Sequence, residues 1–194
     1  MIAAIVIEDL ATRYTQASDV GVAFVYCNFR RREEQTADQL LASILKQLSR
    51  QRPVHPDHLK ELWNTHKQKD TRPSFDDISK ILRLTASSFS RVFVVVDAVD
   101  ECQASDGCRI TFLNAIQSMQ KELGVNVLAT SRFIPEIVDH FRAVGSVTLE
   151  ISASREDVER YIEGNMMRLP SIVQRNPKLQ ADIKDSISGA VDGM

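Results

Sequence analysis

The apolar positions of the chain change period along its length, and this change predicts the order of strands and helices. Residues 92–96 form an unbroken apolar run, which is typical of a strand buried on both faces of a parallel sheet. Three other segments, residues 21–29, 125–130 and 147–151, also have strand patterns. Because helical patterns separate these segments, the sequence predicts an α/β protein with a parallel sheet.

Apolar residues at helical spacing predict the helices between and after these strands. The predicted helices are residues 2–14, Thr36 to Leu48, Ser74 to Leu82, Asp106 to Leu123, Pro135 to Phe141, Ser154 to Ile162 and Asn176 to Ile187. Residues 50–73 are the least regular part, with a short helix that packs Trp63 on the core. We place a domain boundary near residue 152, so that residues 1–152 form the core and 153–194 a helical extension.

Three carboxylates follow the central apolar run: Asp97, Asp100 and Glu101. They stand at the carboxyl end of a buried strand, where open α/β sheets bind ligands. Such a cluster repels itself unless a cation or a polarised water shares the site. The pattern is that of a Walker B box, with Asp97 as the carboxylate that holds magnesium. The alternative interpretation is a buried strand that runs into an acidic turn.

The residues Asp97-Ala-Val-Asp-Glu-Cys102 resemble the extended Walker B box of NACHT-type signalling NTPases of the STAND class. Fungal members related to the nephrocystin N-terminal domain are the most similar. A second strand, residues 125–130, ends in Ser131 and Arg132 and resembles the sensor 1 strand of that family. The terminal arginine of that strand faces the last phosphate of the nucleotide, a task that suits its planar, permanently charged fork.

The resemblance implies a three-layer P-loop NTPase fold that binds ATP or GTP with Mg²⁺ and hydrolyses it slowly as a signalling switch. Asp97 would hold the ion through its water shell. Asp100 or Glu101 would activate the attacking water, with Asp100 slightly favoured. Arg132, next to Ser131, would contact the terminal phosphate. The expected partners are nucleotide and related NACHT domains or a second copy of the chain.

The phosphate-binding loop of such enzymes, Gly-x-x-x-x-Gly-Lys-Ser/Thr, does not occur in the sequence. Residues 2–14 resemble the helix that follows this loop, so we expect the chain to begin just after it and to lack the first strand of the sheet. Residues 153–194 resemble the start of the family's helical lid, and Ala190 to Met194 a point where relatives continue. We therefore expect weak nucleotide binding and no activity by this chain alone.

Two other function classes fit parts of the sequence. A non-catalytic NACHT-like interaction or oligomerisation module is favoured by the missing phosphate loop, whereas the acidic box and Arg132 favour NTPase ancestry. A small nucleotide or nucleoside kinase is a weaker alternative, because it needs the same missing loop. Nucleotide binding with and without magnesium separates the enzyme from the interaction module.

Composition sets further limits on the partners. The chain has 194 residues and a formal charge of -2, which gives no electrostatic case for nucleic acid or an anionic membrane. No apolar run approaches the roughly 20 residues that a membrane-spanning helix needs. The cysteines, Cys27, Cys102 and Cys108, are odd in number and lack a metal-ligand spacing, which predicts a reducing, cytoplasmic location.

Overall fold

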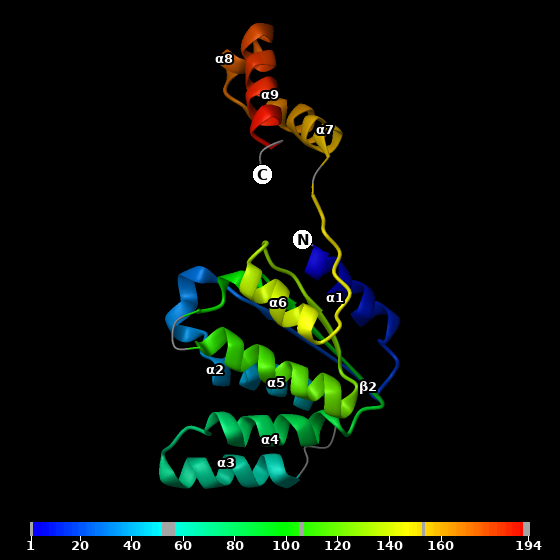
Figure 1. The fold of residues 1–194 in the computed structure, drawn as a ribbon, viewed down its shortest axis with the longest axis vertical. Coiled ribbons are helices and arrows are strands. Elements are labelled where there is room, and N and C mark those ends of the chain that lie inside the picture. The colour runs from blue at the N-terminus through cyan, green and yellow to red at the C-terminus, as the bar shows by residue number, and fades with distance from the viewer. Residues whose placement is uncertain (1, 52–56, 105–106, 153, 192–194) are drawn as a thin grey trace. The chain divides into compact units, whose positions relative to one another are not determined.

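The computed structural model describes residues 2–51, 57–104, 107–152 and 154–191 (Figure 1). Asp106, at which a helix is predicted to begin, and residues 192–194 of the C-terminal motif lie outside these ranges. The chain divides into two compact units, Met1–Ser146 and Val147–Met194, so that the division precedes residue 152. The described residues form a mixed α/β structure that is mostly helical.

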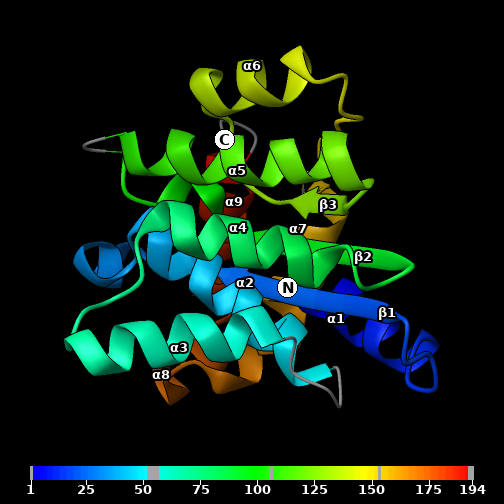
Figure 2. The same cartoon turned by 90° about the horizontal axis from the view of Figure 1, so that it is seen from below.

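Three parallel strands form the sheet of the first unit: β1 (Val20–Tyr26), β2 (Arg91–Asp97) and β3 (Asn126–Ala129). They lie side by side in the order β1-β2-β3 (Figure 2). The central strand β2 pairs with both neighbours, which confirms the prediction from its unbroken apolar run. Parallel pairing places the carboxyl ends of all three strands at one edge of the sheet.

Helices cover both faces of this sheet. Helix α1 (Ile2–Arg13) packs Ala3 and Leu10 against Val95 on one face. Val94 and Val96, whose side chains point to the opposite face, join the main core with the remaining helices. These helices are α2 (Ala37–Gln51), α3 (Asp57–Lys69), α4 (Phe75–Ala86), α5 (Cys108–Leu123) and α6 (Pro135–Ala143). Two 3₁₀ turns, η1 (Phe29–Glu34) and η2 (Val99–Glu101), follow β1 and β2.

The second unit contains the predicted C-terminal helices. It consists of α7 (Arg155–Asn165), the 3₁₀ turn η4 (Met166–Arg168), α8 (Ser171–Gln174) and α9 (Pro177–Val191). Ser154 caps α7 in a capping box with Asp157, and Lys184 of α9 contacts Glu163 of α7 at 2.6 Å. None of the helices in the described part of the chain is long and apolar enough to cross a membrane.

Two predictions from the sequence are wrong. Residues 147–151 do not form a strand, and Val147 is 98% exposed. A segment with an alternating pattern is stable as a strand only when a neighbouring strand completes its backbone hydrogen bonds. The described residues provide no such neighbour for residues 147–151. Trp63 is 67% exposed rather than packed on the core, because α3 faces the core with Leu59 and Leu62 instead. The expected last strand is therefore missing from the sheet.

The outer edge of β1 is covered by glutamine side chains. The Gln51 amide accepts a hydrogen bond from Val22 N at 2.8 Å and donates to Val22 O. The Gln47 amide does the same for Phe24, at 3.0 Å and 2.7 Å. Because α2 places these glutamines four residues apart, their carboxamides substitute for a neighbouring strand. We call this pair of residues the glutamine ladder.

We expect the variant Gln47→Leu/Gln51→Leu to be less stable and to self-associate. It removes the partners of four backbone groups, which we expect to lower the free energy of unfolding by about 1–3 kcal/mol. It also exposes a strand edge that can pair with another chain. Denaturant unfolding and sedimentation velocity measure the two effects. Lys46→Leu, on the exposed side of α2, is the matched control; equal behaviour of the two proteins would contradict this role.

Candidate functional site

The site is built where β2 and β3 end. Val96 pairs with Ala129, so Asp97 and Thr130 leave the sheet side by side. The Thr130 hydroxyl donates to Asp97 Oδ1 at 2.6 Å and accepts from Ala98 N at 3.0 Å. This hydroxyl therefore fixes both the Asp97 carboxylate and the first peptide of the turn that follows β2. We call this turn, Ala98 with η2, the acidic turn because it carries Asp100 and Glu101. Its position after β3 was the only sequence signal, and the site prediction did not include it.

A left-handed residue turns the chain after Asp97. Ala98 has φ 55° and ψ 52°, a conformation that costs a non-glycine residue about 1–2 kcal/mol. The turn that follows buries Val99, whose backbone N donates to Thr130 O at 2.9 Å. As a result Asp100 points inward, toward the chain that follows β3, rather than out into solvent.

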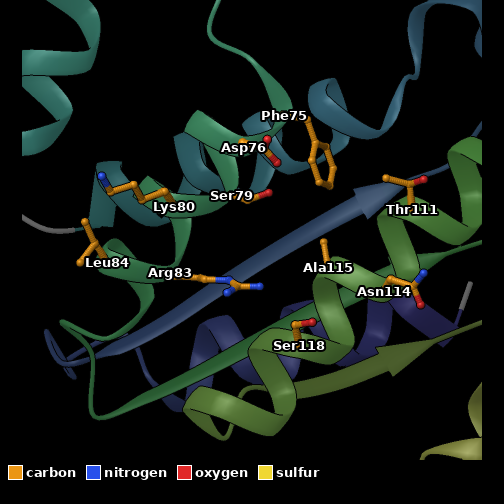
Figure 3. A pocket seen from close by; sticks show the side chains of 10 residues that line it. All are labelled: Phe75, Asp76, Ser79, Lys80, Arg83, Leu84, Thr111, Asn114, Ala115 and Ser118. Carbon is orange, nitrogen blue, oxygen red and sulfur yellow. The ribbon is translucent and has the colours of Figure 1, made fainter.

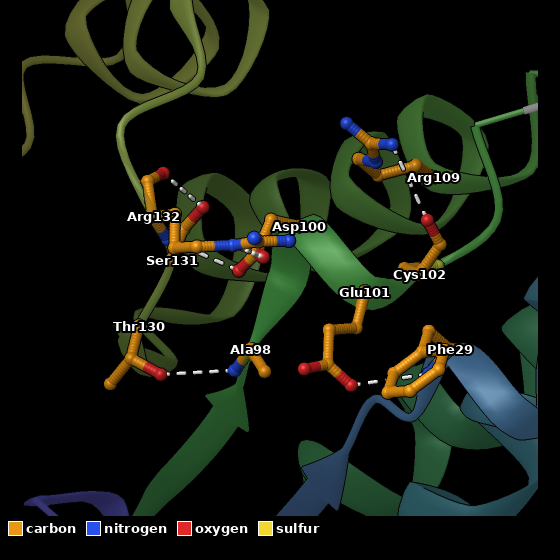
Figure 4. Close-up of polar contacts among 9 residues, drawn as sticks. All are labelled: Phe29, Ala98, Asp100, Glu101, Cys102, Arg109, Thr130, Ser131 and Arg132. Carbon is orange, nitrogen blue, oxygen red and sulfur yellow. Dashed lines mark hydrogen bonds and ion pairs between the residues drawn. The ribbon is translucent and has the colours of Figure 1, made fainter.

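Asp100 and Arg132 form the central ion pair of the site (Figure 4). Arg132 Nε donates to Asp100 Oδ2 at 2.6 Å, and Arg132 N donates to Oδ1 at 3.1 Å. The Asp100 side chain is only 4% exposed, whereas that of Arg132 is 79% exposed. Burial raises the pKa of Asp100, but the hydrogen bonds from the Arg132 side chain and backbone outweigh it and lower the pKa below its usual value. The carboxylate is thus held in its charged form.

Glu101 lies on the other side of the turn from this ion pair. Its Oε2 accepts a hydrogen bond from Phe29 N at 3.1 Å, in the segment that follows β1 (Figure 4). The Ser131 hydroxyl donates to its neighbour, Arg132 O, at 2.7 Å. The structure therefore brings all five predicted site residues to one edge of the sheet. Asp100 and Glu101 have different hydrogen-bond partners there: Arg132 for Asp100 and the backbone of Phe29 for Glu101.

The donor set at this edge fits a magnesium ion only in part. Within the described residues, no three histidine, cysteine or acidic side chains form a metal-binding group. Mg²⁺, however, is usually bound by one or two carboxylates while waters and phosphates complete its octahedron. Asp97, fixed by Thr130, fits the role of such a carboxylate. Asp100 fits it less well, because both its oxygens are already bonded to Arg132.

A buried arginine supports the acidic turn from behind. Arg109 Nη2 donates to Cys102 O at 3.3 Å, and Nη1 lies 3.5 Å from Glu136 Oε2 on α6. Arg109 is in the first turn of α5 and is buried. It therefore connects the end of the acidic turn with the helix that follows Arg132. The helical pattern of α5 gave no signal for this role, since it identified only the apolar core face.

The family model described as nephrocystin 3, N-terminal, matches residues 1–132. The match starts at α1, spans the sheet and ends at Arg132, so it covers more than half of the chain. The chain belongs to the nephrocystin 3, N-terminal family. Comparison with curated proteins and with solved structures gave no significant match. All residues of the acidic turn and its ion pair lie within the part shared with this nephrocystin family.

A groove away from this edge is a different feature of the nephrocystin-like region. It lies between α4 and α5, has a volume of about 650 Å³, and is lined by Phe75, Ser79, Lys80, Arg83, Asn114 and Ser118 among others (Figure 3). Arg83 forms an ion pair with Glu122 at 3.1 Å, so its charge is compensated within the two helices. Among the described residues that line the groove, Asp76 is the only acid, in contrast to the carboxylates that follow β2.

We expect Asp100→Asn to destabilise the protein by about 1.5–3 kcal/mol at pH 7, because it removes a charged acceptor from a buried ion pair. The folded-state pKa of Asp100 is lowered, so this stabilisation is present above the ordinary aspartate pKa of about 3.9. It is lost as the pH falls through the lowered value. Denaturant unfolding from pH 7 to pH 2 should therefore show the wild-type advantage disappearing at acidic pH.

Asp139→Asn is the matched control for this experiment. Asp139 pairs with Arg142 at 3.3 Å, but both side chains are exposed, so we expect little change. A loss of stability at Asp100→Asn that is no larger than at Asp139→Asn, or that persists unchanged at pH 2, would contradict the importance of the buried pair.

Proposed function

We propose that the first unit is the Walker B and sensor part of a NACHT-type, P-loop nucleotide-binding domain that acts as a signalling switch. The observation that carries this proposal is the meeting of Asp97, Asp100 and Arg132 at the carboxyl edge of two adjacent parallel strands. Carboxylates and an arginine at this edge are suited to bind a metal–phosphate group. Membership in the nephrocystin 3, N-terminal family is compatible with this proposal.

The roles of the carboxylates follow from their contacts. Asp97 would hold Mg²⁺ through water, with Thr130 keeping its carboxylate in place. When bound with ATP or GTP, the ion supplies positive charge to the phosphate oxygens.

Arg132 can contact a terminal phosphate without leaving Asp100. Its Nε is bonded to Asp100, while the exposed guanidinium presents further N–H donors to solvent. A buried carboxylate that fixes Nε therefore aims the remaining donors. This arrangement supports Arg132 as the phosphate sensor, with Asp100 as the residue that positions it.

The same geometry favours Glu101 over Asp100 for orienting the attacking water. A general base works best with a pKa near the working pH, whereas the pKa of Asp100 is lowered by Arg132. Protonation of Asp100 would also break its ion pair. Glu101 belongs to the same turn, and its Oε2 accepts a hydrogen bond from Phe29 N, so its use as the base would leave the bonds between Asp100 and Arg132 intact. We therefore propose Glu101 as the water-orienting carboxylate.

A non-catalytic interaction module is the second candidate function. Two observations favour it: the sequence has no phosphate-binding loop, and the outer edge of β3 has no partner strand in the described part of the chain. An open strand edge is a surface on which related domains or a second copy can pair. In this case the acidic turn would serve only the fold.

We expect the chain alone to bind MgATP or MgGTP more weakly than micromolar. A phosphate loop contributes several charge-assisted hydrogen bonds, each worth roughly 1.5–3 kcal/mol, and the sequence has none of them. Isothermal titration with and without magnesium measures this directly. A micromolar Kd that depends on magnesium would show that the phosphate-binding loop is not needed for nucleotide binding, and it would contradict this prediction.

In a chain extended at its N-terminus by a strand and a Gly-Lys-Thr loop, we expect the site residues to control activity. Asp97→Asn should abolish the magnesium dependence of binding, and Glu101→Gln should reduce turnover with little effect on affinity. Asp100→Asn should weaken binding together with turnover, because it releases Arg132. Phosphate release and titration calorimetry measure both quantities, with Asp139→Asn as the control.

The outcomes of that experiment separate the candidates. Hydrolysis by Glu101→Gln at the wild-type rate, with Asp100→Asn inactive but binding normally, would return the water-orienting role to Asp100. If the extended chain with an intact loop neither binds nor hydrolyses nucleotide, the switch proposal fails and the interaction module is favoured.

A further inference from the structure

Helix α6 lies alongside α5 and directly follows the candidate site along the chain (Figure 2). Arg132 is only three residues before Pro135, the first residue of this helix. The helix contributes Ile137 to the main core, and Phe141 packs against that core. Because the connection is so short, a change in the packing of α6 reaches Arg132 directly.

His140 of α6 has a buried ring nitrogen. Its Nε2 atom is inaccessible to solvent, and the residues that the structure describes provide no hydrogen-bond partner for it. The backbone of the same residue is anchored to α5, since Nε2 of the buried Gln117 donates to His140 O at 3.3 Å. A neutral imidazole can be packed in this way at modest cost. A protonated imidazole would bury a positive charge without an acceptor, which is far more costly.

The charges on α6 itself do not offset such a positive charge in the packed helix. Glu136 lies one turn before His140, but its carboxylate is already paired with Arg109 of α5 at 3.5 Å. Asp139 is paired with Arg142 at 3.3 Å, and both side chains are exposed. The carboxylates of the helix are thus engaged elsewhere.

Helix α5 offers no carboxylate to His140 either. Gln117, which contacts the His140 backbone, is neutral, and Lys121, one turn later, is exposed and carries the same charge as an imidazolium. Burial lowers the pKa of His140, and the charge of Glu136 opposes this shift only in part. The packed helix therefore accepts the neutral form of the ring.

We propose that His140 makes the packing of α6 on α5 sensitive to pH, so that uptake of a proton loosens α6 and the segment that holds Arg132. In the loosened state the imidazolium reaches solvent and pairs with Glu136, four residues earlier on the same helix. This pairing also withdraws Glu136 from Arg109. The inference goes beyond the proposed function, since it requires no nucleotide.

The direction of the shift gives the pH range of this effect. The pKa of His140 in the folded chain lies below its ordinary value of 6.5, so the packed helix is fully stable above that pH. This stability is lost as the pH falls through the lowered value. The pKa of Asp100 is lowered as well, so its carboxylate stays charged in this range. Loosening of α6 therefore precedes the acid loss of the ion pair between Asp100 and Arg132.

Amide hydrogen exchange of the intact 194-residue chain, followed by NMR, tests the proposal. It is measured about one pH unit above and about one unit below the ordinary imidazole pKa and corrected for the intrinsic effect of pH. We expect faster exchange at the lower pH in α6 and at the Arg132 amide, which donates to Asp100, but not in α2. Each unit by which the pKa is lowered corresponds to an about tenfold larger opened population.

Variants assign the effect to His140. His140→Phe keeps an aromatic ring that cannot be protonated, so exchange in α6 should no longer respond to pH; His140→Gln is a second uncharged variant, and circular dichroism verifies the fold of both. His66→Gln, on α3, is the matched control and should respond as the wild type does.

Four outcomes would overturn the proposal. They are an unchanged pH response in both His140 variants, an equal acceleration of α2 and α6, an Arg132 amide that does not respond, and an NMR titration that gives His140 a pKa at or above its ordinary value. The titration needs no variant, so it decides the matter even if a substitution disturbs the fold.

Discussion

The pairing of β2 with a strand on each side is the interaction on which the rest of the structure depends. It places an apolar strand between two neighbours, so that Val95 faces α1 while Val94 and Val96 face the larger helical layer. Burial on both faces leaves only the two ends of the strand for polar groups, Arg91 at the amino end and Asp97 at the carboxyl end. The acids can gather there because their neighbours are the ends of parallel strands and the turns that follow.

At this edge of the sheet, the guanidinium of Arg132 compensates the negative charge of the buried Asp100 carboxylate. A buried carboxylate is costly unless it is paired and hydrogen-bonded, and Arg132 supplies both a charged donor and a backbone N–H. The pairing depends on register, since Val96 opposite Ala129 places the two residues near each other. A shift of β3 by one residue would move Arg132 away from Asp100.

The sequence predicted the elements whose signals are local. The apolar run before Asp97 and the helix starts at Ser74, Pro135 and Ser154 each depend on a few neighbouring residues, and the structure confirms them. Residues 147–151 have an equally clear pattern, but a strand also needs a partner, which no local pattern guarantees.

The features that the sequence did not predict depend on contacts between distant residues. Arg109 was hidden in a helix whose pattern shows only an apolar face, and its partners come from the acidic turn and α6. Asp97 and Arg132 were recognised as site residues from their motifs, whereas the bond between Arg132 and Asp100 required the register of the sheet.

The glutamine ladder determines which edge of the sheet can accept a further strand. On the β1 side, the backbone groups of Val22 and Phe24 are already saturated by side chains of the same chain, so a further strand there would have to displace two carboxamides. On the β3 side, the described residues provide no paired strand, so a further strand can pair with this edge. Any additional strand, from this polypeptide or from another, is therefore expected to pair with β3. It would then lie next to the segment that carries Thr130 and Arg132, so that extension of the sheet would also enclose the candidate site on that side.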